Sequence, residues 1–509
     1  METRQSFLDF ARQLESSAAD PIARAVTMTD SLVGAELGQS LRLCALPHEF
    51  DATILRVMMP QLSAEEARQR VETFAELSVV QSNSAAHAIH DSWRRELLRW
   101  WLRDEQRDTF AAASLALAGH FARERDASSG TQAEKALRQH MYHLLGADQG
   151  AGFTEFESLC RRARHDWRFA ECAALIRLVH DYDDVLVPAR RAALAYHEGK
   201  LAADLRNWAK AANVFSELAT NPDADLAYRI NAFVRLGNSQ RNLGQTALAI
   251  ISLERALQLA TSPQGTEHRW RVLQELGDAC REAGQLALAE KMLKGALLAA
   301  ESSRSADLAG LQTSLGLLYR RQREPAAAVA ALTKSLELLV ASGDVFRPAQ
   351  VYNNLGLARR DLREWLEAEA AFTESLKLKK KAGDLSGQAN VLQNLGLVHA
   401  QQGHLTQAIS AATEAARLFE SQGDLRLAGV VNEALASYNE RSGNGAVSRA
   451  HLEKARALFE SAGDLSGVAR VQAALAPARH WLPWWAWLFI AVTALLLVAG
   501  IVTVAMEGS

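Results

Sequence analysis

Cysteine is scarce in this 509-residue sequence, and its four copies lie far apart. No Cys-x-x-Cys pair occurs, so the sequence offers neither the ligand spacing of a zinc ribbon nor the framework of a disulfide-rich domain. This usage fits a protein that is kept in a reducing compartment. The four residues are Cys44, Cys160, Cys172 and Cys280.

The short motifs that mark common catalytic sites are also missing. There is no Gly-x-x-x-x-Gly-Lys-[Ser/Thr] loop to cradle a nucleotide phosphate, no Gly-x-Ser-x-Gly and no His-Glu-x-x-His. Two histidine pairs, His87 with His90 and His140 with His143, have i, i+3 spacing, but no cysteine or acidic pattern completes a metal site. We therefore expect a non-enzymatic protein with no catalytic residue, metal, cofactor or small-molecule substrate, and we interpret these histidines as surface or packing residues.

Neither sign of charge dominates the composition. The sequence has 56 Lys and Arg against 59 Asp and Glu, for a net charge of −3, which gives no general attraction to nucleic acid. The stretch Met1–Phe10 is polar and mixed in charge, so it lacks the apolar core of a signal peptide. Hydrophobic residues make up 49% of the sequence, which is enough to build a core in about three or four structural units.

A period of 39 or 40 residues runs from about Leu226 to Leu475. Each period contains a Leu-Gly pair, with alanine replacing the last glycine, and several periods end in Gly-Asp. The Leu-Gly positions are Gly237, Gly277, Gly316, Gly356, Gly396 and Ala436, and the Gly-Asp glycines are Gly343, Gly383, Gly423 and Gly463. A fixed period in this range predicts stacked supersecondary units, each formed here by two helices and a tight turn.

Two further positions of each period hold small residues. Twelve residues after the key position come Ala249, Ala289, Ala328, Ala368, Ala408 and Ser448. Nineteen residues after it come Ala256, Ala296, Ser335, Ser375, Ala415 and Ala455. Helices approach closely only where side chains are small, so these positions predict the contact lines within and between the helix pairs.

A Leu-Gly pair in the first helix and two small residues in the second are the signature of the tetratricopeptide repeat, which this array resembles over six units. The array departs from that family in its period, about 40 rather than 34, and in having Gly-Asp where a proline is usual. The longer period resembles that of kinesin light chains and of bacterial regulators with extended arrays. The resemblance implies an all-α superhelix whose concave surface binds a protein or peptide. An unrelated α-solenoid is the alternative.

Arginine recurs four residues after four of the key glycines, until Ala400 ends the series. In the family this slot lies toward the concave groove, and neighbouring slots hold amides. The candidate partner-binding residues are the four ladder arginines, Arg241, Arg281, Arg320 and Arg360, and the amides Asn231, Gln274, Asn353, Asn390 and Gln393. Guanidinium groups can hold carboxylates bidentately, so we expect an acidic segment or a C-terminal carboxylate as ligand. The alternative is that the arginines form inter-repeat salt bridges with acidic neighbours such as Asp278, Glu282 and Asp361.

The N-terminal region predicts three helices and a small hairpin, the element order of a winged helix. The helices are expected at Leu41–Leu46, Phe50–Met59 and Ala64–Leu77, and the strands at Ser78–Gln81 and Ala86–His90. The stretches Leu41–Asp51, Ala88–Arg94 and His140–Asp148 resemble the winged-helix region and the following helices of STAND-type signalling NTPases. The NTPase core is absent, so no ATPase activity is implied. The third helix has more glutamates than arginines, which disfavours contact with DNA phosphates.

The C-terminal stretch 484–506 contains 23 residues without a charge. As a helix it would span about 35 Å, against about 30 Å of bilayer hydrocarbon. Tryptophans gather at its start, arginines precede it and Glu507 follows it. These features predict a single-pass, C-terminally anchored membrane protein with its large N-terminal part in the cytoplasm. A buried soluble helix is the alternative.

The sequence therefore predicts an all-α protein in six segments. They are an N-terminal helical segment (1–37), a winged-helix-like domain (38–105), a helical region with degenerate repeats (106–195), a tetratricopeptide array (196–475), a juxtamembrane linker (476–483) and a transmembrane helix (484–506). The favoured function is a membrane-tethered scaffold that binds a protein or peptide in its groove. A sensor that works with an NTPase or effector on another polypeptide is the alternative, and a membrane-tethered DNA-binding regulator is the weakest.

Overall fold

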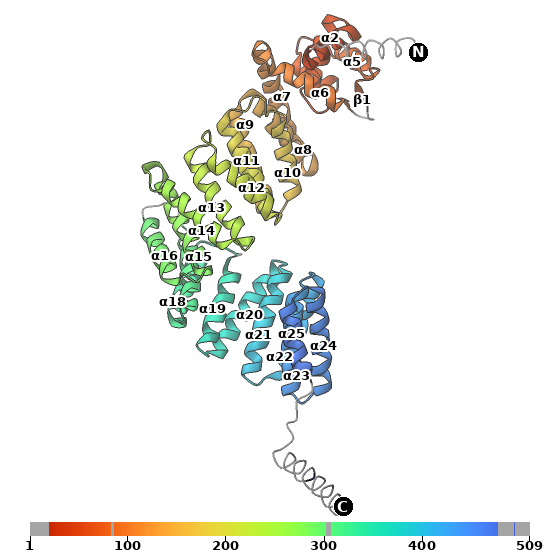
Figure 1. The fold of residues 1–509 in the computed structure, drawn as a ribbon. Coiled ribbons are helices and arrows are strands. Elements are labelled where there is room, and N and C mark those ends of the chain that lie inside the picture. Colours follow the sequence, from red (N-terminus) through yellow and green to blue (C-terminus); the bar gives the residue numbers. More distant parts are fainter. Residues whose placement is uncertain (1–19, 83–85, 302–306, 346, 477–492, 494–509) are drawn as a thin grey trace, which may run out of the picture. The chain divides into compact units, whose positions relative to one another are not determined.

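The computed structural model describes residues 20–82, 86–301, 307–345 and 347–476, together with Thr493. The chain forms two compact units, residues 1–306 and 307–509, and helices make up most of each (Figure 1). The predicted transmembrane segment 484–506 lies outside the described residues except for Thr493, and so does the linker after Ala476. Within the part of the protein that the structure describes, no helix is long and apolar enough to cross a bilayer.

The first unit opens with short helices and a two-stranded antiparallel hairpin, in which Val80 pairs with Ile89. These elements are α2 (Pro21–Val33), α3 (Ala35–Leu43), α4 (Ala52–Met58), α5 (Ala64–Ala75), β1 (Val80–Ser82), β2 (His87–Ile89), α6 (Asp91–Trp101) and the 3-10 turn η1 (Asp104–Gln106). The predicted order of three helices and a hairpin is present. The helix expected at Leu41–Leu46 starts six residues earlier, because the left-handed Gly34 ends α2 and the backbone enters α3 directly.

The rest of the first unit is built from helix pairs. They are α7 (Arg107–Ala127), α8 (Gly130–Ala147), α9 (Gln149–His165), α10 (Phe169–His180), α11 (Pro188–Asp204), α12 (Trp208–Thr220), α13 (Leu226–Asn242), α14 (Thr246–Ala260), α15 (Arg269–Glu282) and α16 (Leu286–Ala300), with the 3-10 turn η2 (Pro263–His268) between α14 and α15. One core runs from the N-terminal helices through α11, and Trp101, Tyr142 and Tyr182 are among its largest buried side chains.

The second unit repeats the same pattern of helix pairs. Its helices are α17 (Leu308–Arg321), α18 (Pro325–Ala341), α19 (Arg347–Asp361), α20 (Trp365–Lys381), α21 (Leu385–Gln401), α22 (Leu405–Ser421), α23 (Leu425–Arg441), α24 (Gly445–Ser461) and α25 (Leu465–Leu475). The last of them, α25, packs on α24 as a single helix. The prediction of an all-α array of helix pairs is confirmed for the described residues.

The key glycines allow the two helices of a pair to touch. A Cβ atom placed on Gly356 would lie 2.7 Å from the ring of Phe372, which comes from the second helix of the same pair and is fully buried. The predicted small positions are buried as well, and Ala368 and Ser375 have no exposed surface. Any larger side chain at these places would push the paired helices apart.

Every turn inside a pair from α9 to α24 contains one residue with left-handed backbone geometry. The residues are Trp167, Arg206, Gly244, Gly284, Arg323, Arg363, Gly403 and Gly443, which follow one another at intervals of 38 to 40. Half of them are not glycine, although other residues adopt this conformation at a cost of about 1–2 kcal/mol. The regular intervals extend the repeat pattern back to α9 and α10, in the region that the sequence described as degenerate.

Candidate partner-binding surface

The first helices of successive pairs contact one another directly. In the first unit α11 contacts α13 and α13 contacts α15, and in the second unit α17 contacts α19, α19 contacts α21 and α23 contacts α25. We call the surface that these first helices form in each unit its inner surface. All nine predicted site residues lie on first helices, so they share the elements that build this surface.

The two ladder arginines of the first unit are half-buried and held by carboxylates. Arg241 donates from Nε to Glu282, at 2.9 Å, and from Nη1 to Glu275, at 3.1 Å. Arg281 donates to Asp278, at 3.1 Å, on its own helix. Burial raises the pKa of Glu275, even against the opposing charge of Arg241.

The two ladder arginines of the second unit share one acceptor. Arg320 donates from Nε to Asp361 at 2.8 Å, and Arg360 donates from Nη2 to the same carboxylate at 3.0 Å. Their side chains are 27% and 28% exposed, so solvent still reaches both guanidinium groups. Arg241 and Arg320 thus form inter-repeat salt bridges, as the alternative interpretation has it, whereas Arg281 and Arg360 pair with carboxylates of their own helices.

The predicted amide residues differ in how far their side chains are engaged. Asn353 is buried and accepts a 3.1 Å hydrogen bond from Asn394 of the next first helix. Asn231 and Asn390 each donate to a carbonyl of their own helix, at 2.9 Å. Gln274 and Gln393 are half-buried. Because each amide both donates and accepts, these residues retain capacity for a further hydrogen bond.

The sequence prediction missed a row of leucines on the inner surface of the second unit. Leu317, Leu357 and Leu397 lie four residues after Thr313, Asn353 and Gln393 and are half-buried. Residues at i and i+4 share a helix face, so each leucine lies beside the polar slot of its own helix. These leucines directly follow the key glycines, which is a visible signal, but by composition alone they resemble the core leucines that precede the same glycines.

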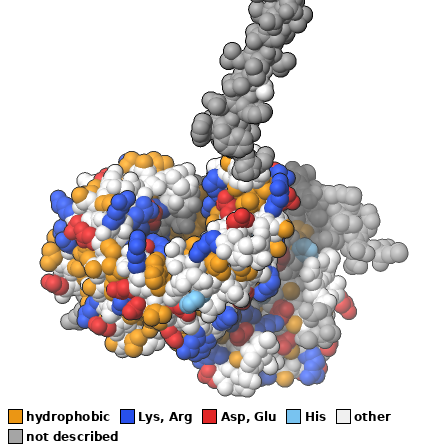
Figure 2. Space-filling view, turned by 90° about the horizontal axis from the view of Figure 1, so that it is seen from below, with side chains coloured by type: hydrophobic (Ala, Val, Ile, Leu, Met, Phe, Trp, Pro, Cys, Tyr) orange, Lys and Arg blue, Asp and Glu red, His pale blue; other side chains and the backbone are white. Residues whose placement is uncertain are grey.

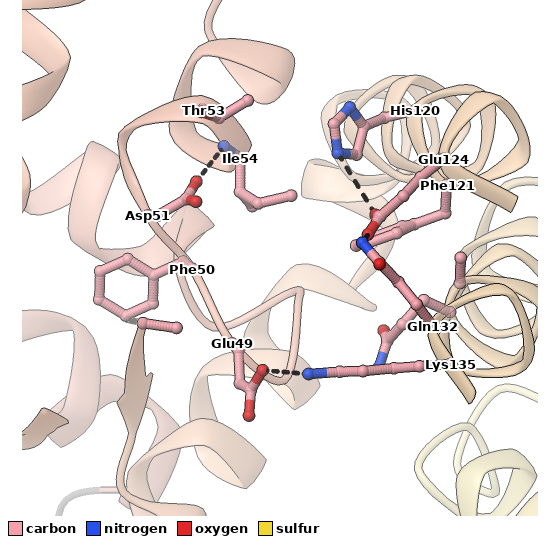
Figure 3. Close-up of a pocket in the computed structure, with 13 residues that line it drawn as sticks. Glu49, Phe50, Asp51, Thr53, Ile54, His120, Phe121, Glu124, Gln132 and Lys135 are labelled. Carbon is pink, nitrogen blue, oxygen red and sulfur yellow. Dashed lines mark hydrogen bonds and ion pairs between the residues drawn. The ribbon is translucent and has the colours of Figure 1, made fainter. Parts of the chain in front are cut away.

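A cavity of about 490 Å³ lies in the first unit between the start of α4 and the α7–α8 pair. Figure 3 shows Glu49 and Lys135 reaching toward one another from the two sides, 2.6 Å apart. Asp51 accepts from the backbone N–H of Ile54 and so caps α4. The Glu49–Lys135 ion pair thus joins the two sides of the cavity, and Asp51 is engaged in the cap. Among the described residues that line the cavity, no nucleophile lies beside a base.

Three of the four histidines in the i, i+3 pairs have polar or aromatic neighbours. His87 lies 2.8 Å from Ser82 across the hairpin turn, and His140 lies 2.9 Å from the carbonyl oxygen of Ala118. His143 is fully buried and stacks on Phe121, and burial lowers its pKa well below the ordinary value. The fourth, His90, lies 3.4 Å from the hydroxyl of Ser92. Among the described residues, no three His, Cys, Asp or Glu side chains converge on a metal-sized site.

A largely buried ion pair fastens the N-terminal helices to the helix pairs that follow. Arg94 of α6 donates to Asp181 at 2.9 Å and to the hydroxyl of Tyr142 at 2.6 Å. Burial would raise the pKa of Asp181, but a hydrogen bond from His48 and the charge of Arg94 hold it at about 2. This cluster joins three elements and is structural in its geometry.

Charges of both signs are intermixed on the face of the molecule that Figure 2 presents, where apolar side chains lie between them. No broad field of one sign is visible among the described residues on that face, in keeping with the near-balanced composition.

Comparison with known proteins places the repeats in a named class. Residues 347–421 and 230–263 each match the tetratricopeptide repeat family, so the array contains tetratricopeptide repeats. A search of curated proteins finds no match.

Several solved structures are similar to parts of this chain. A STAND protein with a tetratricopeptide repeat sensor from Pyrococcus horikoshii is 13% identical, over 94% of this chain and 67% of that one, with a TM-score of 0.51. BtubC from P. vanneervenii is 19% identical over 44% of this chain and 92% of that one, with a TM-score of 0.38. A Rap protein complexed with competence and sporulation factor is 12% identical over 64% and 95%, with a TM-score of 0.45. At 13% identity, the likeness to the STAND protein is one of fold.

Proposed function

We propose that this protein is a non-enzymatic scaffold, held at a membrane, that binds an extended protein segment along the inner surface of its repeats. The observation that carries the proposal is a pattern repeated on α17, α19 and α21. Each of these helices presents a polar slot, a leucine four residues later and, on α17 and α19, an arginine seven residues later. Residues at i, i+4 and i+7 share one helix face, so the slots form three parallel rows.

The three rows match the chemistry of an extended segment. Such a segment exposes backbone N–H and C=O groups that need partners, and the amides of Asn353, Gln393 and Asn390 can both donate and accept. The half-buried leucines provide apolar contact for side chains of the same segment. Arg320 and Arg360, which solvent still reaches, can exchange Asp361 for a carboxylate of the partner.

We also propose that the segment 484–506 anchors the protein in a membrane, with the repeats on the cytoplasmic side. The uncharged run, its tryptophans and the preceding arginines support this proposal. Protease added to sealed vesicles with their cytoplasmic face outward should digest the repeats. Protection of the repeats would overturn the proposed orientation, and release of the protein by alkaline carbonate would overturn the anchor.

A second candidate function is a sensor that works with an NTPase or effector on another polypeptide. It is favoured by the order of elements in the first unit, where three helices and a hairpin precede the repeats as in a winged helix of STAND proteins. The DNA-binding alternative gains no support from α5, because Arg68 pairs with Glu65, and Arg70 pairs with Glu36 and donates to Ser40. Neither arginine is left for a phosphate.

A photo-crosslinking experiment on the full-length protein in its native membrane tests the scaffold proposal. A benzophenone amino acid replaces Leu397 on the inner surface or, as control, Leu366, which lies on the second helix α20 and is 74% exposed. We expect adducts from position 397 alone, with the crosslinks mapping to one short stretch of the captured protein. Equal adducts from both positions, or crosslinks scattered over many unrelated proteins, would refute the proposal.

A further inference from the structure

The cavity between α4 and the α7–α8 pair has more hydrogen-bond acceptors than its own donors satisfy. Glu49, Asp51 and Glu124 line it, and one oxygen of each carboxylate accepts no hydrogen bond from the residues that the structure describes. Of the three, only Glu49 pairs with a lysine, Lys135, at 2.6 Å. The Nε2 of His120 lies 3.9 Å from Glu124, which is beyond hydrogen-bond distance. Negative charge therefore exceeds positive charge around the cavity.

Gln139 of α8 adds a buried acceptor to the same cavity. Its Oε1 is shielded from solvent and has no hydrogen-bond partner among the described residues. Buried acceptors in native proteins are nearly always paired, so this one points to a donor that the chain itself does not provide. The last side-chain torsion of glutamine is soft, so a small rotation turns the oxygen toward the cavity.

Apolar side chains line the cavity beside the carboxylates on both sides. Ile54 follows Asp51 by three residues at the start of α4, and Phe121 precedes Glu124 by three residues on α7. Figure 3 shows Asp51 and Ile54 on one side of the cavity and Phe121 and Glu124 on the other. A ligand that spans the cavity therefore meets a carboxylate and an apolar side chain on each side.

We propose that this cavity binds a small aliphatic di- or polyamine. Each ammonium group donates up to three hydrogen bonds and carries the positive charge that Asp51 and Glu124 call for. The methylene chain between the ammonium groups packs against Ile54 and Phe121. The cavity volume of about 490 Å³ lies within the range of small-molecule sites, about 300–1,000 Å³. The amine is a ligand and not a substrate, because no nucleophile lies beside a base among the described residues of the cavity.

A bare metal ion does not suit the same groups. Among the described residues, no three His, Cys, Asp or Glu side chains converge on a metal-sized site. A diamine carries its two charges apart from one another, so it can serve carboxylates on opposite sides. The cavity lies outside the helices that form the inner surface, so this inference goes beyond the scaffold function and stands or falls separately from it.

Calorimetric titration of full-length protein in non-ionic detergent, with spermidine as the probe, tests the proposal. The cavity variant, Asp51→Asn with Glu124→Gln, removes two carboxylate charges with little change of shape, and asparagine still caps α4. The matched control, Glu72→Gln with Asp225→Asn, removes two exposed carboxylates outside the cavity. We expect one spermidine per protein, affinity at least about tenfold weaker in the cavity variant, and affinity within about twofold of wild type in the control.

Two further measurements sharpen the test. Spermidine should raise the melting temperature of wild type and of the control variant but not of the cavity variant, because a ligand stabilises only the state that binds it. n-Butylamine carries one charge and should bind at least about tenfold more weakly than spermidine. The melting temperature without ligand shows whether the cavity variant is folded. If it is not, Glu124→Gln alone, which leaves the cap of Asp51 in place, repeats the comparison.

Four results would overturn the proposal. They are absence of saturable spermidine binding by the wild type, equal affinities of the folded cavity variant and the control, binding of n-butylamine as tight as that of spermidine, and displacement of spermidine by an equal concentration of Mg²⁺. The last would show that the carboxylates attract any divalent cation.

Discussion

Arg320 of α17 donates from Nε to the carboxylate of Asp361 on α19, 2.8 Å away and 41 residues further along the sequence. The offset is one repeat plus one residue, so the contact joins the last turns of successive first helices. The same offset joins Arg241 to Glu282, Asn394 to Asn353 and Arg441 to the carbonyl oxygen of Ala400. These side chains therefore connect neighbouring repeats along the inner surface.

Alanine replacement of Arg320 and Asp361, singly and together, measures how much this ion pair contributes to the free energy of unfolding. The side chains are 27% and 31% exposed, and solvent screening limits such pairs to about 0.2–1 kcal/mol. A double-mutant cycle on thermal unfolding should return a coupling in that range. The pair Lys334 and Glu337 on α18, with side chains 59% and 60% exposed, is the control and should show less coupling. A coupling above about 2 kcal/mol would contradict this view of the pair.

The sequence predicted the repeats well because one physical requirement recurs in each of them. Gly356 must be small since Phe372 packs against it, and equivalent contacts at a fixed spacing leave a visible period. The four ladder arginines lie near the ends of first helices. The inter-repeat pairing seen for Arg241 and Arg320 could only be given as an alternative, because an arginine at such a slot can turn toward the next repeat or toward a partner.

Other features could not be read from the period. In the degenerate repeats the turn residues are Trp167 and Arg206, so no turn glycine marks where the second helix of each pair begins. Asn394 was missed for a related reason, since it contacts Asn353 from a slot one residue away from the equivalent position.

Asp384→Ala should destabilise the second unit more than the equivalent change in the next repeat. Asp384 caps α21 by accepting from the N–H of Gly387 at 2.8 Å, and it also accepts from the mostly buried Lys379 at 2.8 Å. Loss of the cap and of that partner should together cost roughly 2 kcal/mol. Asp424 occupies the same place before α23 without a side-chain cap, so Asp424→Ala should cost less than about 0.5 kcal/mol. Calorimetry compares the melting temperatures of the two variants with that of wild type. Equal shifts would contradict the capping and pairing role of Asp384.

The contribution of Asp384 should also depend on pH. Burial favours the neutral acid, but the hydrogen bonds from Lys379 and from the Gly387 backbone prevail and lower its pKa. A carboxylate whose pKa is lower in the folded state stabilises the protein above its unfolded pKa, near about 3.9, and loses that effect as pH falls further. The difference in melting temperature between wild type and Asp384→Asn should therefore be constant at neutral pH and shrink below about pH 4. A difference that persists in full at about pH 2 would contradict this dependence.

Arg94→Leu should loosen the N-terminal helices of the first unit. The substitution leaves Asp181, whose pKa is about 2, without its guanidinium partner, and also removes the donor to Tyr142. Breaking a largely buried pair in this way costs roughly 2–4 kcal/mol. The control, Arg99→Leu, breaks an exposed pair with Asp184 and should cost less than about 1 kcal/mol. Hydrogen exchange of α6 reports the difference, and unchanged protection in Arg94→Leu would contradict the role of the pair.

Replacing a left-handed arginine by glycine should stabilise the protein even though no contact is gained. Arg363 has a φ of 62° in the turn between α19 and α20, where any residue other than glycine costs about 1–2 kcal/mol. Glycine removes that cost but adds about 0.4–1 kcal/mol of unfolded-state entropy, which leaves a gain of roughly 0.5 kcal/mol. Gly403→Ala at the equivalent turn should shift the melting temperature the opposite way.

Arg206 has a φ of 57° in the degenerate region, so Arg206→Gly should raise the melting temperature as Arg363→Gly does. If Arg206→Gly lowered it while Arg363→Gly raised it, the turn after α11 would not be equivalent to those of the regular repeats.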